Sequence, residues 1–244
     1  MHSSKTDMTE QTYLTEPDTH TTQATCVEVQ EAGEQKIVIL DKTIFYSQGG
    51  GQPADTGVIE TGTKRFLVYD VRINEEEEIL HYGTFETEPF QKNEPVTLII
   101  NKEKRIQHTN IHSAGHLIDC AIEDIGLTHL KATKGYHFPQ GTYVEYEGSI
   151  EDTAQVKEQL EEALSSLREQ NIPLTIRYIS SQEAKHKGIL LKQGAEARMV
   201  AFQGYEECGC AGTHVKTTAQ LPEITIRKIT SKKGRTKISY LVGA

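Results

Sequence analysis

The stretch Arg105-Ile-Gln-His-Thr-Asn-Ile-His-Ser-Ala-Gly-His-Leu-Ile118 places two histidines, His112 and His116, four residues apart. Apolar residues recur around it with a period near 3.6, Asn101 can cap its start and Gly126 can end it, so a helix is predicted. Side chains four residues apart lie on one face of a helix, close enough to bind one metal ion. The sequence therefore predicts a metal site on this helix.

A second pair of metal-binding residue types occurs far downstream, in Glu207-Cys-Gly-Cys-Ala-Gly-Thr-His-Val215. Cys210 and His214 stand there at the same spacing as the helical histidines. Two imidazoles on a helix, together with a thiolate and an imidazole on a glycine-containing turn, make a tetrahedral zinc set. The two motifs together predict a Zn²⁺ site.

Spacing alone leaves the membership of this site open. His108 and His112 form an equally good pair on the helix, and Cys208 can take the place of Cys210 as the thiolate. Cys210 is preferred because its spacing to His214 matches that of the helical pair. The type of site is open as well, since four protein ligands are typical of a structural zinc, whereas a catalytic zinc usually keeps one position for water.

Composition describes an ordinary globular chain of 244 residues with a formal net charge of -9. This charge argues against a protein that binds nucleic acid over most of its surface. From Ile224 onward, however, the chain has six basic residues and no acidic one. Such a segment fits a local contact with RNA, and it equally fits a solvated hairpin.

The cysteines and the apolar runs bear on the cellular location. Four cysteines are too few for a disulfide framework and fit metal binding in a reducing cytoplasm. No apolar run approaches the ~20 residues that a membrane span needs, and the first residues lack the pattern of a secretory signal. We therefore expect a cytoplasmic protein with no membrane partner.

Residues 1–12 are expected to form a disordered tail, and residues 13–100 a small antiparallel β-barrel domain. Six short β-type runs, separated by turn residues, support the barrel: Ala24–Val29, Lys36–Leu40, Gly57–Glu60, Lys64–Val71, Ile79–Tyr82 and Val96–Ile100. Between the second and third runs lies Phe45-Tyr-Ser-Gln-Gly-Gly-Gly-Gln-Pro53. Its three glycines permit positive φ and a close approach of another group. The loop is either an irregular turn or a segment that presents backbone amides and Gln52 to a ligand.

Residues 101–244 are expected to form a second domain, with antiparallel strands covered by helices. A glycine-punctuated stretch, Lys131 to Gly141, follows the histidine-bearing helix. The pattern beyond it predicts helices over Asp152–Gln170 and Gln182–Lys187, and strands over Thr142–Glu147, Leu174–Ser180, Ala197–Phe202, Ile224–Thr230 and Arg235–Val242. The fold class predicted for the whole chain is α+β.

Three motifs carry a resemblance to a known family: His112-Ser-Ala-Gly-His-Leu-Ile118, Cys210-Ala-Gly-Thr-His-Val215 and Phe45-Tyr-Ser-Gln-Gly-Gly-Gly-Gln-Pro53. They resemble the free-standing alanyl-tRNA editing proteins, often called AlaX, which are relatives of the editing domain of alanyl-tRNA synthetase. The resemblance runs from about Tyr13 to the C-terminus. It looks like the medium-length class, which has an N-terminal β-barrel followed by an editing core.

The resemblance implies roles for particular residues. It implies that His112, His116, Cys210 and His214 bind the zinc ion and form the catalytic site, with His108 left out. It also assigns Gly49, Gly50, Gly51 and Gln52 to substrate binding, in a pocket for serine. The implied activity is the hydrolysis, in trans, of the ester that links a wrong amino acid to tRNA specific for alanine. Serine is the foremost wrong amino acid, and glycine is the second candidate.

Two departures from the family pattern and two competing functions stay open. Synthetase-embedded relatives usually carry Thr where this chain has Gly115, so a hydroxyl that could contact the amino acid is missing. Cys208 adds a thiol that we expect beside the ligands. The main alternative function is a non-catalytic, zinc-stabilised tRNA-binding module, and another is a hydrolase of a different small ester or amide. A zinc protease is disfavoured, because Ser113 stands where such an enzyme needs its glutamate base.

Overall fold

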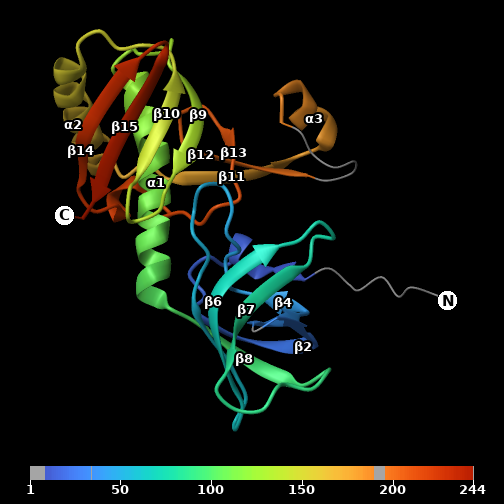
Figure 1. Cartoon of the computed structure of the whole chain (residues 1–244). Helices are drawn as coiled ribbons and strands as arrows, with labels where there is room; N and C mark the ends of the chain where they lie inside the picture. Colours follow the sequence, from blue (N-terminus) through green and yellow to red (C-terminus); the bar gives the residue numbers. More distant parts are fainter. Residues whose placement is uncertain (1–8, 34, 190–195, 244) are drawn as a thin grey trace. The chain divides into compact units, whose positions relative to one another are not determined.

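A computed structural model describes residues 9–33, 35–189 and 196–243 of the chain (Figure 1). The chain divides into two compact units, the first made of residues 1–49 and 53–106, and the second of residues 50–52 and 107–244. The predicted α+β fold, with a β-barrel followed by antiparallel sheets and helices, is confirmed. None of the helices in the described part of the chain combines the length and the apolar composition of a membrane span.

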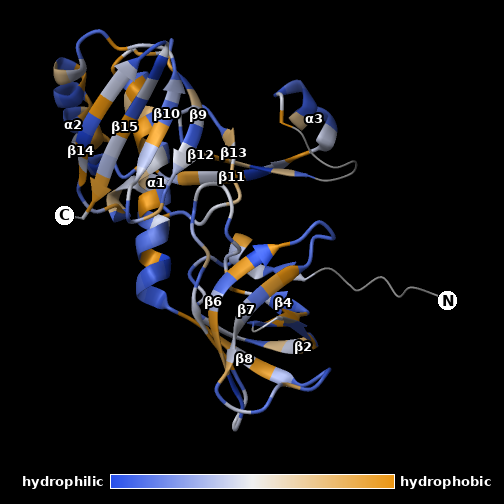
Figure 2. Cartoon of the chain, viewed as in Figure 1, coloured by the Kyte–Doolittle hydropathy of each residue, from blue (hydrophilic) through white to orange (hydrophobic). Residues whose placement is uncertain are grey.

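The first unit contains a closed barrel with the strand order β2-β3-β7-β6-β5-β8. All of its pairings are antiparallel. The strands are β2 (Thr21–Ala32), β3 (Gln35–Leu40), β5 (Gly57–Glu60), β6 (Arg65–Ile73), β7 (Ile79–Phe85) and β8 (Pro95–Ile100). Buried and exposed side chains alternate along β6 and β8, as a two-residue period requires. Figure 2 shows apolar residues recurring along the strands of the barrel.

Residues 10–12 have regular secondary structure, so the prediction of a disordered tail over residues 1–12 is wrong for these residues. Residues 1–8 lie outside the described part of the chain. Strand β1 (Glu10–Gln11) pairs in parallel with β4 (Lys42–Thr43), and the short 3-10 helix η1 (Thr12–Leu14) follows. Thr9 Oγ1 donates a hydrogen bond to Leu40 O at 2.8 Å. A strand of two residues is too short to show a periodic pattern, and the partners of β1 lie about 30 positions away in the sequence. The local sequence therefore does not predict this pairing.

A buried ion pair joins the start of the long helix α1 (Lys102–Asp124) to the loops of the first unit. The Arg105 guanidinium binds the Asp55 carboxylate, and both side chains are almost completely buried. Arg105 also donates to Pro17 O at 2.8 Å, and Asp55 Oδ2 accepts a hydrogen bond from Tyr46 N at 2.7 Å. Each charge therefore has several polar partners, as a buried pair requires.

Apart from residues 50–52, the second unit begins with the part of α1 from Gln107 onward. It contains an antiparallel four-stranded sheet with the order β14-β15-β10-β9. The strands are β9 (Lys131–Tyr136), β10 (Tyr143–Glu147), β14 (Ile224–Lys232) and β15 (Arg235–Val242), and helix α2 covers Thr153–Glu169. One hydrophobic core joins α1, α2 and this sheet; its members include Leu117, Leu160, Ile226 and Ile238. β9 is a strand that the glycine-punctuated sequence did not predict.

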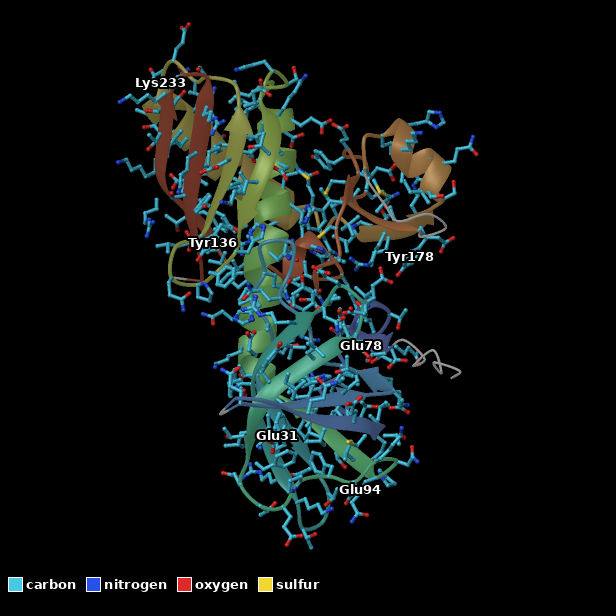
Figure 3. The ribbon with its side chains drawn as sticks, turned by 45° about the vertical axis from the view of Figure 1, so that its right-hand side comes forward. Glu31, Glu78, Glu94, Tyr136, Tyr178 and Lys233 are labelled. Atoms are coloured by element: carbon cyan, nitrogen blue, oxygen red, sulfur yellow. The ribbon has the colours of Figure 1, made fainter. Side chains whose placement is uncertain are left out.

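A smaller antiparallel sheet and two short helices complete the second unit. The sheet has the order β11-β12-β13, with β11 (Leu174–Ile179), β12 (Ala197–Phe202) and β13 (Cys208–Gly209). The helices are α3 (Ser181–His186) and the 3-10 helix η2 (Thr218–Gln220). The β14–β15 hairpin turns at Lys233 and Gly234, both with positive φ. Figure 3 shows Lys233 at the end of this hairpin.

Candidate metal centre and adjoining cavity

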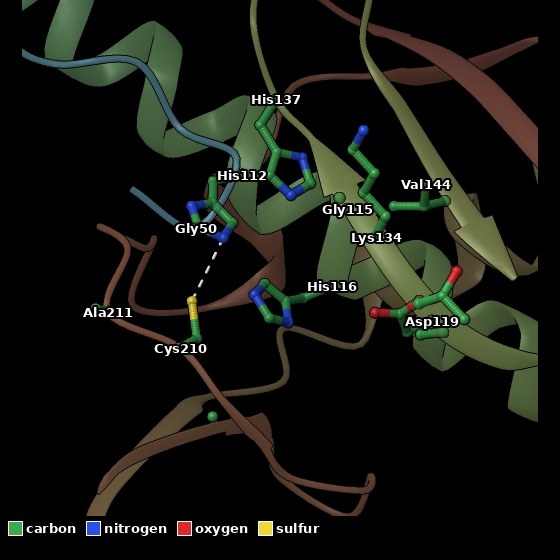
Figure 4. Close-up of a pocket in the computed structure, with 14 residues that line it drawn as sticks. Gly50, His112, Gly115, His116, Asp119, Lys134, His137, Val144, Cys210 and Ala211 are labelled. Carbon is green, nitrogen blue, oxygen red and sulfur yellow. Dashed lines mark hydrogen bonds between the residues drawn. The ribbon is translucent and has the colours of Figure 1, made fainter. Parts of the chain in front are cut away.

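Four residues of the second unit come together as a possible metal-binding group. His112 and His116 lie on α1, and Cys210 and His214 lie on the loop after β13; their ligand atoms are all within 4.8 Å of one another. Cys210 Sγ is 3.4 Å from His112 Nε2 and 3.3 Å from His214 Nε2. Figure 4 shows Cys210 facing His112 across this group. Three imidazoles and one thiol are a donor set that suits Zn²⁺, so the residues present fit a metal ion.

Gln52 determines which nitrogen of His112 faces the group. Gln52 Oε1 accepts a hydrogen bond from Thr213 N–H at 3.2 Å, and it lies 2.7 Å from His112 Nδ1. An amide oxygen only accepts, so His112 Nδ1 carries the proton and Nε2 presents its lone pair to the group. Gln52 Nε2 donates to Thr213 Oγ1 at 3.0 Å, and the side chain is completely buried. Partners of this kind orient a metal-binding histidine.

Ser113 connects the helix to the second motif. Its Oγ accepts a hydrogen bond from Val215 N at 3.1 Å and lies 3.3 Å from His214 Nδ1. His214 therefore has a polar partner at Nδ1, while its Nε2 is directed to Cys210. The residue that disfavoured a zinc protease in the sequence thus has a positioning role in the structure.

Gly212 is required by the close approach of His112 to the Cys210 loop. A Cβ atom at this position would lie 2.2 Å from His112 Nδ1, far inside a normal contact. Gly212 N–H donates to Cys210 Sγ at 3.3 Å, and Arg198 Nη1 donates to the carbonyl oxygens of Cys210 and Gly212 at 2.8 and 3.1 Å. Burial raises the pKa of the Cys210 thiol, while the Gly212 amide and the Arg198 charge lower it. Burial is the larger effect, so the pKa of Cys210 lies above its usual value, and the two donors offset part of the cost of forming the thiolate, which is the form that binds a metal.

The histidines of the group are held in the form that a metal needs. Burial lowers the pKa of His116 to about 4, and it lowers the pKa of His112 and of His214 well below the usual value. A neutral imidazole has a free lone pair for coordination, whereas a protonated one has none.

The two alternative ligands have other places in the structure. Cys208 Sγ lies 3.5 Å from His116 Nδ1, so this thiol contacts a member of the group and is not itself a member. His108 is buried one turn earlier on α1, and it also stands outside the group found among the described residues.

A cavity of about 250 Å³ lies beside the group. Helix α1 lines it with His112, Gly115, His116 and Asp119, which follow one another at helical spacing on one face. β9 and the residue after it contribute the opposite side, including Lys134, Gly135 and His137. Figure 4 shows the rings of His112, His116 and His137 turned toward the same space. The cavity suits a group of amino-acid size.

Asp119 and His137 are polar residues of this cavity that the motifs did not identify. Tyr146 donates a hydrogen bond to Asp119 Oδ1 at 2.5 Å, and burial raises the pKa of the Asp119 carboxyl to about 6. Asp119 could have been found from the sequence, because it follows His112 at i+7 on the same helix face. His137 has no local signal of this kind.

The glycine loop reaches the cavity through one of its residues. Gly50 lines the cavity, and Gly50 and Gly51 both have positive φ. Gly51 O accepts a hydrogen bond from His137 N at 2.8 Å. Gly49 lies in the first unit, where its carbonyl oxygen accepts from Tyr46 Oη at 2.9 Å. Gln52 contacts His112 and Thr213, as described above.

Comparisons with known proteins point to one enzyme class. A family model for class II (A) tRNA synthetases matches residues 4–104. The chain is 30% identical over 229 residues to an alanine–tRNA ligase of Methanothermobacter thermautotrophicus, a match that covers 90% of this chain and 24% of that protein. The chain is related to alanine–tRNA ligases. Alanine–tRNA ligases of Lachnoclostridium phytofermentans and Paraburkholderia xenovorans are each 29% identical, over 225 and 199 residues.

The extent of these matches includes the whole candidate site. A match over 90% of the chain leaves out roughly a tenth of it. More residues than this unmatched tenth precede the glycine loop, and more residues also follow His214. The matched segment therefore includes the glycine loop and both candidate metal motifs. The chain spans about a quarter of the length of the curated relatives it matches.

Proposed function

We propose that this chain is an editing hydrolase that acts in trans and removes serine, and also glycine, from wrongly charged tRNA specific for alanine. The supporting observation is the juxtaposition of the His112, His116, Cys210 and His214 group with a cavity of amino-acid size, in a chain related to alanine–tRNA ligases. The resemblance of the motifs to the free-standing editing proteins connects this site to ester hydrolysis.

The reaction is the hydrolysis of the aminoacyl ester. A water molecule adds to the ester carbonyl carbon, the bond from that carbon to the ribose oxygen of the terminal adenosine breaks, and free amino acid and uncharged tRNA are released. A bound Zn²⁺ would supply Lewis acidity at the ester carbonyl or at the water. Gln52 and Ser113 orient His112 and His214 for the ion. Gly49, Gly50, Gly51 and Gln52 are the proposed serine side of the pocket.

The proposed substrate follows from the physics of discrimination. Serine exceeds alanine by one hydroxyl, so a pocket built for alanine rejects serine by only ~10²-fold. A second site that hydrogen-bonds the hydroxyl can remove serine and spare alanine, because the alanine methyl group would leave a buried polar partner unsatisfied. A polar cavity beside the metal group suits this second site.

The test is deacylation of Ser-, Gly- and Ala-charged tRNA for alanine by the purified, zinc-loaded protein. We expect rapid hydrolysis of the first two and little of the third. His116→Ala should lose both the metal and the activity, while His186→Ala on the exposed face of α3 should keep both. If the zinc-loaded protein binds tRNA and accelerates neither the Ser nor the Gly reaction, the proposal fails and a tRNA-binding module takes its place.

A further inference from the structure

His137 is a buried histidine of the cavity that neither metal motif contains. It directly follows β9, and only 5% of its surface is exposed. Its ring stacks on that of His112, with 4.4 Å between centroids, and it lines the cavity beside the metal group. Its backbone N–H donates to Gly51 O at 2.8 Å, so the glycine loop holds it in place.

Two hydrogen bonds determine the tautomer of His137. Tyr240 Oη donates to Ile111 O at 3.0 Å, which uses the single phenol proton, since a carbonyl oxygen only accepts. The 2.7 Å contact between Tyr240 Oη and His137 Nδ1 must therefore be donated by the imidazole. The proton of His137 lies on Nδ1, and Nε2 has a lone pair. No described residue hydrogen-bonds Nε2, so this lone pair is available to a group in the cavity.

Two glycines next to His137, Gly115 and Gly135, leave space that the ring of His137 fills. A Cβ atom at Gly115 would lie 2.4 Å from His137 Cε1, and one at Gly135 would lie 2.3 Å from His137 Nε2. Real Cβ contacts are not this short, so a side chain at either position would displace the ring. The ring of His137 therefore occupies the space that a side chain at position 115 would need.

We propose that His137 is the residue that recognises the serine hydroxyl, with Nε2 accepting a hydrogen bond from it. This inference rests on the proposed function. The carboxyl group of Asp119 in the same cavity is the better partner for the cationic α-amino group, which leaves the neutral hydroxyl for the imidazole acceptor. The methyl group of alanine would leave Nε2 unsatisfied, which costs binding energy. Glycine leaves room for a water molecule at this position, so it remains a substrate.

The test compares three charged tRNAs on three variants. His137→Leu removes the acceptor, His137→Gln keeps an acceptor near the position of Nε2, and His186→Leu makes the same change on an exposed histidine. For His137→Leu, kcat/KM should fall about tenfold or more with Ser-tRNA, stay within about threefold with Gly-tRNA, and rise with Ala-tRNA. His137→Gln should recover part of the Ser reaction, and His186→Leu should match the wild type. Bound zinc and the melting temperature of each variant check the fold.

A second variant covers the case in which His137→Leu does not fold. Gly115→Ala favours the helix by its intrinsic propensity, and its methyl group displaces the His137 ring. It should also lower the Ser reaction and spare the Gly reaction. Equal loss with Ser- and Gly-tRNA, or an unchanged Ser reaction, would overturn the role of His137. A wild-type protein that hydrolyses neither substrate would instead overturn the proposed function.

Discussion

At the scale of single residues, the candidate site depends on side chains that orient the four possible metal ligands and are not themselves ligands. Gln52 is the clearest example, because one amide contacts His112 through Oε1 and Thr213 through both of its polar atoms. It thereby connects a residue of α1 to a residue of the Cys210–His214 loop. Ser113 makes a similar connection through His214 and Val215. The relative placement of the two metal motifs is thus maintained by neutral hydrogen bonds.

Gln52→Ala should weaken zinc binding by roughly 10- to 100-fold, because His112 loses the acceptor that orients its ring and sets its tautomer. Gln52→Glu keeps an acceptor oxygen at this position and should stay closer to the wild type. Zinc dissociation constants from competition with a chelator measure both effects. Gln23→Ala, the same change at an exposed position of β2, is the control. A Gln52→Ala protein with wild-type zinc affinity would show that Gln52 does not support the group.

The candidate metal-binding group could be predicted from spacing, whereas the residues that contact and orient it could not. His112 and His116 are four apart on a helix, and Cys210 and His214 are four apart on a glycine-containing turn, so both pairs are visible in the sequence. Spacing could not decide against His108 or Cys208, because that choice depends on where the turn meets the helix. The same holds for His137, which meets His112 only through the fold of the chain.

At the scale of elements, the barrel strands were predictable because alternation and turn residues mark them locally. The alternating burial of β6 and β8 follows the apolar positions that the sequence shows. β1 and β9 were missed for a different reason. β1 has two residues, and its partner β4 is remote. β9 contains two lysines and a glycine among its six residues, and it pairs with β10 through a register shift, so its sequence lacks a regular period of two.

A buried histidine of the barrel should make stability depend on pH. His81 on β7 is completely buried; its Nδ1 donates to Val38 O at 2.9 Å, and Thr43 Oγ1 donates to its Nε2 at 2.8 Å. Burial lowers the pKa of His81 to about 4. Below about pH 6.5 the His81 imidazole of the unfolded chain binds a proton. In the folded protein the same imidazole binds a proton only near pH 4. The contribution of neutral, buried His81 to the free energy of unfolding is therefore complete above pH 6.5, and it is lost as the pH falls toward 4.

The comparison of wild type with His81→Gln isolates this effect. The wild type should lose up to about 3 kcal/mol more of its unfolding free energy than the variant between pH 7.5 and pH 4.5. Urea denaturation of metal-free protein measures the free energies of unfolding, and the titration of the other histidines cancels because both proteins share it. His129→Gln, at an exposed histidine, should behave as the wild type. Parallel pH profiles for wild type and His81→Gln would contradict the prediction.

At the scale of the whole molecule, an acidic chain with a net charge of -9 has to attract a polyanion if it edits tRNA. The β14–β15 hairpin offers the charge for this, since Lys232, Lys233 and Arg235 are all exposed at its end. Figure 3 shows Lys233 extending from that end. Lys237 differs from these three, because its ammonium group lies 3.3 Å from the centroid of the Tyr143 ring. Contacts between exposed lysines and phosphates supply affinity that is independent of nucleotide sequence and sensitive to salt.

Replacing Lys232, Lys233 and Arg235 together by Gln should raise the KM for Ser-tRNA several-fold and leave kcat unchanged, because the hairpin end contributes no residue to the cavity lining. Each lost phosphate contact should reduce the slope of log affinity against log salt by about 0.7–0.9. The control replaces Lys92, Lys102 and Lys104, three exposed lysines of the first unit, by Gln as well. It therefore changes the net charge by the same amount as the hairpin variant. Equal KM increases in the two triple variants would indicate a response to net charge alone. A larger effect in the hairpin variant, with the smaller salt slope, would identify the hairpin as the surface that contacts tRNA.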